Sequence, residues 1–297
     1  MSRRNLMLRE KVIIITGAAG GIGSATAHLF AKCGAILVLT DIHRERLNEL
    51  GEALKDLGTE TMTIEHDVND SESWESLMGR VRQEFGKIDV LINNAGVVQP
   101  GPAEAIELDK VKHQVSVNLL GTIYGCRAAL RIMKQQNFGK IVNVASLGGI
   151  VPMPGEAVYS ATKYAIRGYS LSLKAELRKS PLEIAVVCPD SVDTAQLNYE
   201  LLHDEAVLSF IGEPLKPEKV AKGILKAVKK KKPEILIPTG MGIFCRIGMS
   251  FPGLFFFLLP ILENIGISTM MKRREKQKQS KIEEKRKYDE NEIFEST

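Results

Sequence analysis

Short apolar runs alternate with longer segments of helical periodicity over residues 10–239. The strands of a parallel sheet are buried on both faces and therefore form near-continuous apolar runs, whereas an apolar residue at every third or fourth position is typical of a helix. The runs predict strands over 12–16, 36–40, 61–66, 90–93, 140–145, 183–188 and 234–238.

The segments between these runs predict the helices that connect parallel strands, near 22–33, 43–57, 70–85, 107–136, 157–179 and 217–229. No Pro- or Ser-rich linker and no repeat divides this region. We therefore predict a single α/β domain over 1–240: a Rossmann-like, doubly wound, seven-stranded parallel sheet with helices on both faces. Ligands of such sheets bind at the carboxyl ends of the strands.

The composition, 44% hydrophobic and 26% charged, is typical of a globular protein. The formal net charge is +4, but residues 272–287 hold nine Lys and Arg against three Glu, so the rest of the chain carries about −2. This distribution argues against a nucleic-acid partner. The four cysteines and five histidines lack ligand spacing, so we expect reduced thiols and no metal. The N-terminus has no apolar signal segment, which predicts a cytoplasmic protein.

A glycine-rich turn, TGAAGGIG from Thr16 to Gly23, lies between the first predicted strand and the first predicted helix. Glycines permit a tight turn and the close approach of a pyrophosphate, and the amides at a helix N-terminus stabilise its charge. The turn predicts a dinucleotide site; a purely structural turn is the alternative.

Asp41 ends the second predicted strand. A carboxylate at this place accepts hydrogen bonds from ribose hydroxyls and repels a 2′-phosphate, which favours NAD. Arg44 and Arg46 would lend affinity for a phosphate, so NADP is the alternative cofactor. The alternative role of Asp41 is that of a helix cap.

Tyr159 and Lys163 are four residues apart, which places both on one face of a helix. A free phenol has a pKa near 10, and a neighbouring ammonium favours the phenolate. By itself such a pair is as consistent with an ordinary surface helix. Ser146, at the end of the fifth predicted strand, and Asn118, in the long preceding helix, strengthen the catalytic interpretation.

The turn at 16–23, the strand end Asn93-Asn94-Ala95-Gly96 and the Tyr159/Lys163 pair resemble the short-chain dehydrogenase/reductase superfamily over about residues 10–240. The resemblance implies a catalytic tetrad of Asn118, Ser146, Tyr159 and Lys163. Ser146 would hold the substrate oxygen, Tyr159 would exchange a proton with it, and Lys163 would bind the nicotinamide ribose. Asn118 would support a water that connects the lysine to solvent. A homodimer or homotetramer is also implied.

The same resemblance implies a set of cofactor contacts. Asp67 and Val68 would lie against the adenine, Asn93 to Gly96 would steady the central sheet, and Thr194 would bind the carboxamide or the pyrophosphate. The full predicted set is Gly17, Ala19, Gly21, Ile22, Gly23, Asp41, Asp67, Val68, Asn94, Ala95, Gly96, Tyr159, Lys163, Pro189, Val192 and Thr194.

The loop Pro189 to Thr194 departs from the family pattern PGxVxT, because Asp190 stands where glycine is usual. Glycine at such a place usually marks a positive φ or a close backbone approach, so the departure questions the loop geometry. A Pro-Asp loop also resembles the 3-ketosphinganine reductases, which act on long-chain lipids. Residues 195–216 are apolar enough to cover a hydrophobic substrate, and ordinary packing is the alternative.

Residues 241–271 form an apolar extension, and residues 272–297 a basic tail that we expect to be partly disordered. The longest uncharged run, 247–262, contains Pro252 and Pro260 and is shorter than the roughly 20 residues of a membrane span, so no clean transmembrane helix is expected. The alternatives are a flap over the substrate, an oligomer contact, an interfacial membrane anchor and an atypical span. Basic residues in 272–287 would attract an anionic membrane surface on the cytoplasmic side.

These features predict an NAD(P)-dependent oxidoreductase that interconverts an alcohol and a ketone on a small hydrophobic, lipid-like substrate, with Tyr159 as acid and base. One alternative is a 3-oxoacyl-carrier-protein reductase, and another is a non-catalytic NAD-binding regulator. Asp41 and the extension 241–271 favour the first prediction over the reductase.

Overall fold

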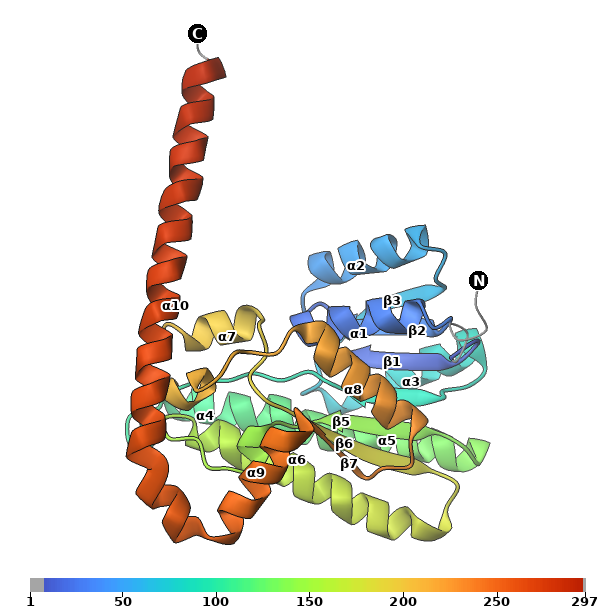
Figure 1. Ribbon diagram of the computed structural model, residues 1–297. Coiled ribbons are helices and arrows are strands. Elements are labelled where there is room, and N and C mark those ends of the chain that lie inside the picture. The colour runs from blue at the N-terminus through green and yellow to red at the C-terminus, as the bar shows by residue number, and fades with distance from the viewer. Residues whose placement is uncertain (1–7, 296–297) are drawn as a thin grey trace.

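The computed structural model describes the backbone of residues 8–295 and the side chains of residues 8–279. One parallel sheet has the strand order β3-β2-β1-β4-β5-β6-β7 (Figure 1). Chain progression reverses between β1 and β4, which is where sheets of this type bind ligands. The predicted fold class is confirmed, and each predicted strand end lies within one residue of the observed bounds: Val12–Thr16, Ile36–Asp41, Thr61–Glu65, Val90–Asn93, Lys140–Val144, Glu183–Pro189 and Glu234–Ile237 for β1 to β7.

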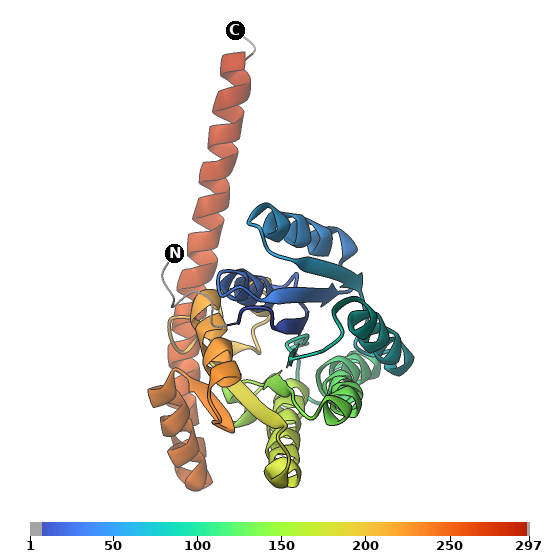
Figure 2. The same ribbon diagram turned by 90° about the vertical axis from the view of Figure 1, so that its right-hand side faces the viewer.

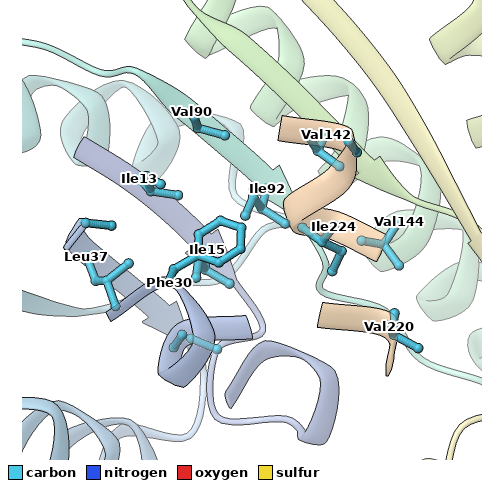
Figure 3. Close-up of a cluster of buried hydrophobic side chains, with 14 of the residues drawn as sticks. Ile13, Ile15, Phe30, Leu37, Val90, Ile92, Val142, Val144, Val220 and Ile224 are labelled. Carbon is cyan, nitrogen blue, oxygen red and sulfur yellow. The ribbon is translucent and has the colours of Figure 1, made fainter. Parts of the chain in front are cut away.

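Two hydrophobic layers cover the two faces of the sheet, because successive strand residues point to opposite sides. Ile13 and Ile15 face α1 (Gly21–Ala31), α2 (Arg44–Asp56) and α8 (Pro217–Lys229). Figure 3 shows the ring of Phe30 from α1 against Ile15 in this layer. Val12 and Ile14 face α3 (Ser71–Phe85), α5 (Gly121–Gln136) and α6 (Ala157–Glu176). Burial on both sides explains the near-continuous apolar runs.

The helix between β4 and β5 departs from regular α geometry in its middle. The predicted helix 107–136 consists of α4 (Leu108–Gln114), a π-helical segment η2 (Val115–Leu120) and α5. Asn118 lies in η2 and is fully buried. A π segment displaces backbone groups from the regular ladder and is frequent at functional sites.

The C-terminal part adds four elements beyond the predicted ones: α7 (Ala195–Glu200), the 3₁₀ turn η5 (Val207–Phe210), α9 (Thr239–Ser250) and α10 (Pro252–Glu295). Pro252 begins α10, as expected of a residue that ends a preceding helix, but Pro260 lies inside α10. The expectation that Pro260 interrupts the segment is therefore wrong; the proline removes one helical donor without ending the helix.

The helical segment Pro252–Gln279 is long and apolar enough to cross a membrane by length and composition, and its most apolar 18-residue window has a mean hydropathy of 1.7. No such helix was expected from the sequence, because the uncharged run ends at Glu263, the only charged residue between 247 and 271. Only 11% of the most apolar window is buried against the rest of the chain. Figures 1 and 2 show α10 along one side of the domain, with its C-terminal half projecting away.

The middle of α10 is nevertheless attached to the domain. A Cβ at Gly266 would lie 2.3 Å from the carbonyl oxygen of Val207, so the helix touches η5 directly there. Met270 is buried among side chains of α7 and η5. Arg273 pairs with Asp193 at 2.7 Å, and Arg274 donates to the carbonyl of Leu201 at 2.7 Å. These contacts fix α10 to the segment that follows β6.

Candidate active site

The glycine turn after β1 brings backbone groups into contacts that only glycine permits. Gly17 has φ +62°, and a Cβ at Gly23 would lie 2.2 Å from the carbonyl oxygen of Gly17. A Cβ at Gly21 would meet the Thr194 side chain at 2.7 Å. The N-terminus of α1 therefore faces a cavity of about 310 Å³ through bare backbone, as pyrophosphate binding requires.

Asp41 lies at the wall of this cavity and is buried. Its carboxylate accepts hydrogen bonds from the backbone amide of Ala19 at 3.0 Å and from that of His43 at 3.0 Å. It therefore connects the end of β2 to the glycine turn and to His43, the N-cap residue of α2, and is not itself the helix cap. Arg46 lines the same cavity, whereas Arg44 is not among the lining residues.

The far end of the cavity is formed by the segment after β3. Val68 is buried and Asp67 is exposed, and both line the cavity as predicted. Two lining residues that the sequence analysis missed are His66 and Asn69; His66 Nε2 and Asn69 Oδ1 are buried without a hydrogen-bond partner. Burial lowers the pKa of His66 to about 4, so its ring is neutral at pH 7. Polar atoms left unsatisfied beside a cavity fit a polar heterocycle such as adenine.

The residues that follow β4 hold the glycine turn in place through hydrogen bonds. Asn94 donates through Nδ2 to the carbonyl oxygens of Thr16 at 3.0 Å and Gly17 at 3.1 Å. The Ala95 amide donates to the Thr16 hydroxyl at 3.1 Å. Asn93 donates to Asn143 of β5 at 2.9 Å, which agrees with the predicted steadying of the central sheet.

Tyr159 and Lys163 lie one turn apart on α6, with the lysine Nζ 5.5 Å from the centre of the tyrosine ring. Lys163 is buried and donates to the carbonyl oxygen of Val144 at the end of β5, at 3.2 Å. Ser146 follows β5 and accepts a hydrogen bond from the Gly148 amide at 3.0 Å. Ser146, Tyr159 and Lys163 line one cavity, so the structure brings three of the four predicted residues together.

The electrostatics at Tyr159 differ from the simple expectation that Lys163 lowers its pKa. Burial and the negative charges of Glu200 and Glu156 raise the pKa of Tyr159, and hydrogen bonds from Ser146 and Gln196 offset only part of this effect. Burial also lowers the pKa of Lys163 to about 8. In the protein alone, both groups therefore favour their neutral forms more than free side chains do.

Asn118, the fourth predicted residue, uses its side chain to hold the chain after β4. Its Oδ1 accepts from the Val97 amide at 2.8 Å, while its Nδ2 donates to the Val97 carbonyl at 2.9 Å and to Thr162 Oγ1 at 3.1 Å. A Cβ at Gly96 would lie 3.3 Å from both Asn118 Oδ1 and Lys163 Nζ. The amide group is thus close to the lysine, but its own hydrogen bonds go to protein atoms.

The loop after β6 places Pro189, Val192 and Thr194 along the candidate active site. Val192 forms a parallel bridge with Leu215, which orders the loop. Asp190 is not among the described residues with positive φ, and its carboxylate accepts from the Ser191 amide at 2.9 Å. The loop therefore does not need glycine at this position, which removes the doubt raised by the sequence.

A second cavity of about 420 Å³ continues from the first and contains Ser146 and Tyr159. Five residues line both cavities: Ile22, Asn94, Gly96, Thr194 and Gln196. The outer wall is apolar and comes from η5, α9 and α10, including Phe244, Phe251, Leu254, Phe255 and Leu258. The predicted cover 195–216 and the apolar extension thus both enclose this space.

Two acidic residues in this wall, Glu156 and Glu200, are not among the site residues predicted from the sequence. They are 2% and 6% exposed. Glu156 immediately precedes α6 and Glu200 ends α7, 44 residues later in the chain. Nothing in the sequence distinguishes them from surface glutamates, since only the fold buries them together.

Comparison with known proteins agrees with this geometry. The model of the short chain dehydrogenase family matches residues 11–205. The chain belongs to this family. A cis-4-hydroxycyclohexanecarboxylate dehydrogenase of Sinomonas cyclohexanicum is 34% identical over 219 residues, covering 72% of this chain and 88% of the relative. An uncharacterised oxidoreductase of Staphylococcus saprophyticus is 34% identical over 230 residues, covering 75% of this chain and 92% of the relative.

Among solved structures, a short-chain dehydrogenase/reductase from Burkholderia phymatum in complex with NAD superimposes with a TM-score of 0.76 at 26% identity. The match covers 84% of this chain and 96% of that one. This protein is accordingly an NAD(P)-dependent oxidoreductase of the short-chain dehydrogenase family. The family model ends at residue 205, before the apolar extension 241–271.

Proposed function

We propose that this protein interconverts a secondary alcohol and a ketone on a hydrophobic substrate at a membrane surface, with NAD as its cofactor. The observation that carries the proposal is the position of Tyr159 and Ser146 in an apolar cavity continuous with the dinucleotide cavity. A bound nicotinamide supplies or accepts the hydride. The residues of the chain bind the substrate and move the proton.

Ser146 orients the substrate oxygen in this mechanism. Ser146 Oγ accepts from the Gly148 amide and its hydroxyl hydrogen-bonds with Tyr159, so a substrate oxygen that takes the place of the phenol as acceptor would lie beside both hydroxyls. Tyr159 then gives its proton to that oxygen during reduction and takes it back during oxidation. Lys163, below the tyrosine ring, stabilises the phenolate and is placed to bind the nicotinamide ribose.

Asp41 supports the preference for NAD over NADP. It lies in the wall of the cavity that would hold the adenosine ribose, and its negative charge would repel a 2′-phosphate there. Arg46, which lines the same cavity, is the residue that would support NADP binding. Gly17, Ala19, Gly21 and Ile22 line the cavity around the pyrophosphate position, and Gly23 keeps the turn tight.

The apolar wall supports a hydrophobic substrate. The side chains of Phe255, Leu258 and Leu262 line the cavity at helical spacing along one side of α10. A 3-oxoacyl-carrier-protein reductase, the alternative within the family, has no need of such a wall. The resemblance to 3-ketosphinganine reductases, the oligomeric state and the basic tail at 272–297 stay predictions; the side chains beyond residue 279 lie outside the described part.

The middle of α10 is attached to the domain, which supports binding of the protein to a membrane surface instead of a full transmembrane span. Arg273 and Arg274 are engaged with Asp193 and Asp204, so this part of the helix stays beside the domain. Most of the exposed apolar side chains lie before it, on α9 and the first turns of α10, among them Ile243, Phe244, Ile247, Phe251, Phe256, Phe257 and Ile261. Such a surface fits the interface of a bilayer, with the exposed Lys272 and Lys276 near anionic headgroups.

The experiment that tests this function measures NADH and NADPH oxidation by the solubilised full chain with a panel of ketones. The panel runs from short acyl thioesters to long-chain ketones and sterols. We expect turnover of the long apolar members with NADH. A preference for acyl thioesters with NADPH would establish the reductase alternative, and cofactor binding without any turnover would establish the regulator.

A further inference from the structure

Gln196 lies where the dinucleotide cavity meets the substrate cavity, on the first turn of α7. It is one of the five residues that line both cavities, and among these Asn94 and Thr194 are the other two with polar side chains. Asn94 donates to two backbone carbonyls of the glycine turn, and the Thr194 hydroxyl donates to the carbonyl oxygen of Val192 at 3.3 Å. The amide of Gln196 instead contacts side chains around the reacting position.

This amide group connects Glu200 to Tyr159. Its Nε2 donates to Oε1 of Glu200, four residues later in the chain, at 3.2 Å. The same side chain hydrogen-bonds with Tyr159. A carboxamide nitrogen carries two hydrogens, so one can go to the carboxyl group and the other to the phenol oxygen. Because Glu200 is buried, its bond fixes the orientation of the amide in a part of the cavity that excludes water.

The charged groups around Tyr159 come from several elements. Within residues 8–279, the titratable side chains that line the same cavity are Glu156, Lys163, Asp190, Glu200, Glu213 and Cys245. Lys163 is the cation of this set, and Glu213 is exposed. Burial and the charges of Glu200 and Glu156 raise the pKa of Tyr159, whereas its hydrogen bonds with Ser146 and Gln196 lower it. The two donors therefore act against the acidic side of the cavity.

The two donors have different positions in the proposed mechanism. Ser146 is beside the substrate oxygen, so its hydroxyl is engaged there when a substrate is bound. During alcohol oxidation Tyr159 accepts the proton of the substrate hydroxyl and must first be a phenolate. An N–H donor to the phenolate oxygen favours this charged form. Gln196 is placed to supply that donor from the side of the cavity opposite to β5.

We propose that Gln196, oriented by Glu200, is a positioning residue that stabilises the phenolate form of Tyr159 from the cover of the substrate cavity. This inference rests on the proposed alcohol–ketone function of the same cavity. Glu200 then has two opposite effects: its charge disfavours the phenolate, while its oxygen holds the amide that favours it. Since Arg274 of α10 donates to the carbonyl of Leu201, directly after α7, the segment that supplies the donor is also attached to the C-terminal helix.

Gln196→Met tests the inference, because methionine has a similar length and no N–H donor. Gln196 is only partly buried, so the variant is expected to fold, which circular dichroism and thermal unfolding establish. The first measurement is kcat/KM for oxidation of 2-decanol with NAD against pH. We expect the ascending limb to move up by about one pH unit, which is about a tenfold loss of kcat/KM at each lower pH. The second is the Cζ carbon NMR signal of Tyr159 in the NAD-bound full chain, assigned with Tyr159→Phe, which follows the phenolate without turnover.

Gln99→Met is the matched control. Gln99 accepts a hydrogen bond from the Tyr199 hydroxyl at 3.0 Å, so this variant also removes a glutamine–tyrosine bond that holds α7, but Gln99 is not among the residues that line either cavity. Its pH profile should be unchanged. Glu200→Gln keeps an oxygen acceptor for Gln196 and removes only the charge, so its profile should move in the opposite direction, to lower pH.

Three results would overturn the inference: an unchanged profile in Gln196→Met, an equal shift in Gln99→Met, or weaker NAD binding by calorimetry without a shift, which would make Gln196 a cofactor contact. The two measurements also separate this inference from the proposed function. If the Tyr159 signal titrates at higher pH in Gln196→Met but no alcohol is oxidised, the role of Gln196 is established and the proposed function is wrong. If 2-decanol is oxidised equally well by both proteins at every pH, the proposed function stands and the inference is wrong.

Discussion

Lys163 Nζ lies 5.5 Å from the centre of the Tyr159 ring, while the pKa of Tyr159 is raised by burial and by Glu200 and Glu156. The tyrosine is thus held between a cation on its own helix and two carboxyl groups of the substrate cavity. The ammonium group of Lys163 favours the phenolate, and the carboxylates of Glu200 and Glu156 favour the phenol. The balance between them sets the pH at which Tyr159 can accept a proton.

Replacing Tyr159 by Phe should lower kcat by roughly 10²–10⁴-fold, because it removes the group that exchanges a proton with the substrate oxygen. Binding of NAD should change little, which calorimetry can establish. Tyr169→Phe is the control, since Tyr169 lies on the same helix but packs against the core on the other side. Full activity in Tyr159→Phe would contradict the proposed mechanism.

Neutralising Glu200, one of the two buried glutamates near Tyr159, should shift the pH profile of alcohol oxidation to lower pH. The charges of Glu200 and Glu156 raise the pKa of Tyr159, so Glu200→Gln lowers it and the phenolate forms at lower pH. The measurement is kcat/KM against pH with 2-decanol, which has no amine. Glu213→Gln should leave the profile in place. If the ascending limb of the kcat/KM profile stays unchanged or moves to higher pH in Glu200→Gln, Glu200 does not raise the pKa of Tyr159.

Local patterns in the sequence were sufficient to predict the sheet and most of the candidate site. β1 and β4 are buried on both faces, so their composition shows them directly, and the glycine turn and Tyr159 carry short-range signals. The order of the elements then places Ser146 and Lys163 at the same edge of the sheet. These predictions needed no knowledge of distant contacts.

The burial of Glu156 and Glu200 and the path of α10 could not be predicted from local sequence patterns. Glu156 precedes a helix and Glu200 ends one, positions where glutamate is normally solvated, and their burial depends on the packing of η5 and α10 over the cavity. Pro260 was expected to break the apolar run 247–262, whereas it lies inside α10. The hydrogen bonds of the Asn118 side chain likewise depend on the backbone of Val97, which lies 21 residues away in the sequence.

Replacing Asp41 by Asn should reduce the preference for NAD over NADP. The amide keeps the size of the side chain and an acceptor for the Ala19 amide, but it removes the charge that repels a 2′-phosphate. We expect the ratio of kcat/KM for the two cofactors to change by about tenfold or more, equivalent to about 1.4 kcal/mol. Asp67→Asn, at the far end of the same cavity, is the control and should change the ratio much less.

A methyl group in the glycine turn should weaken both cofactor binding and the fold. The Cβ of Ala at position 23 would lie 2.2 Å from the Gly17 carbonyl oxygen, which is backbone and cannot move aside cheaply. Gly23→Ala should destabilise the protein by about 1–3 kcal/mol and lower the affinity for NAD. Gly79→Ala is the opposite case: it lies within α3 with nothing within 4 Å, so it should stabilise by about 0.5–1 kcal/mol. Thermal unfolding and calorimetry measure both variants.

The two sides of α10 have separate functions in the proposed protein, and this separation gives a test of membrane attachment. Phe255 and Leu258 line the cavity, whereas Phe256 and Phe257 point away from it and are 57% and 76% exposed. Replacing Phe256 and Phe257 by Ser should therefore reduce binding to anionic liposomes by roughly tenfold or more, since each phenyl ring loses its transfer from water.

Cosedimentation with liposomes measures the loss, and Leu108→Ser is the matched control, because Leu108 is 74% exposed and belongs to α4, outside the apolar extension. Reduction of a short, water-soluble ketone should be unchanged in the Phe256/Phe257 variant, since neither side chain lines the cavity. Retained liposome binding would mean that another surface covers these rings, with a second copy of the chain as the next hypothesis to test by sedimentation.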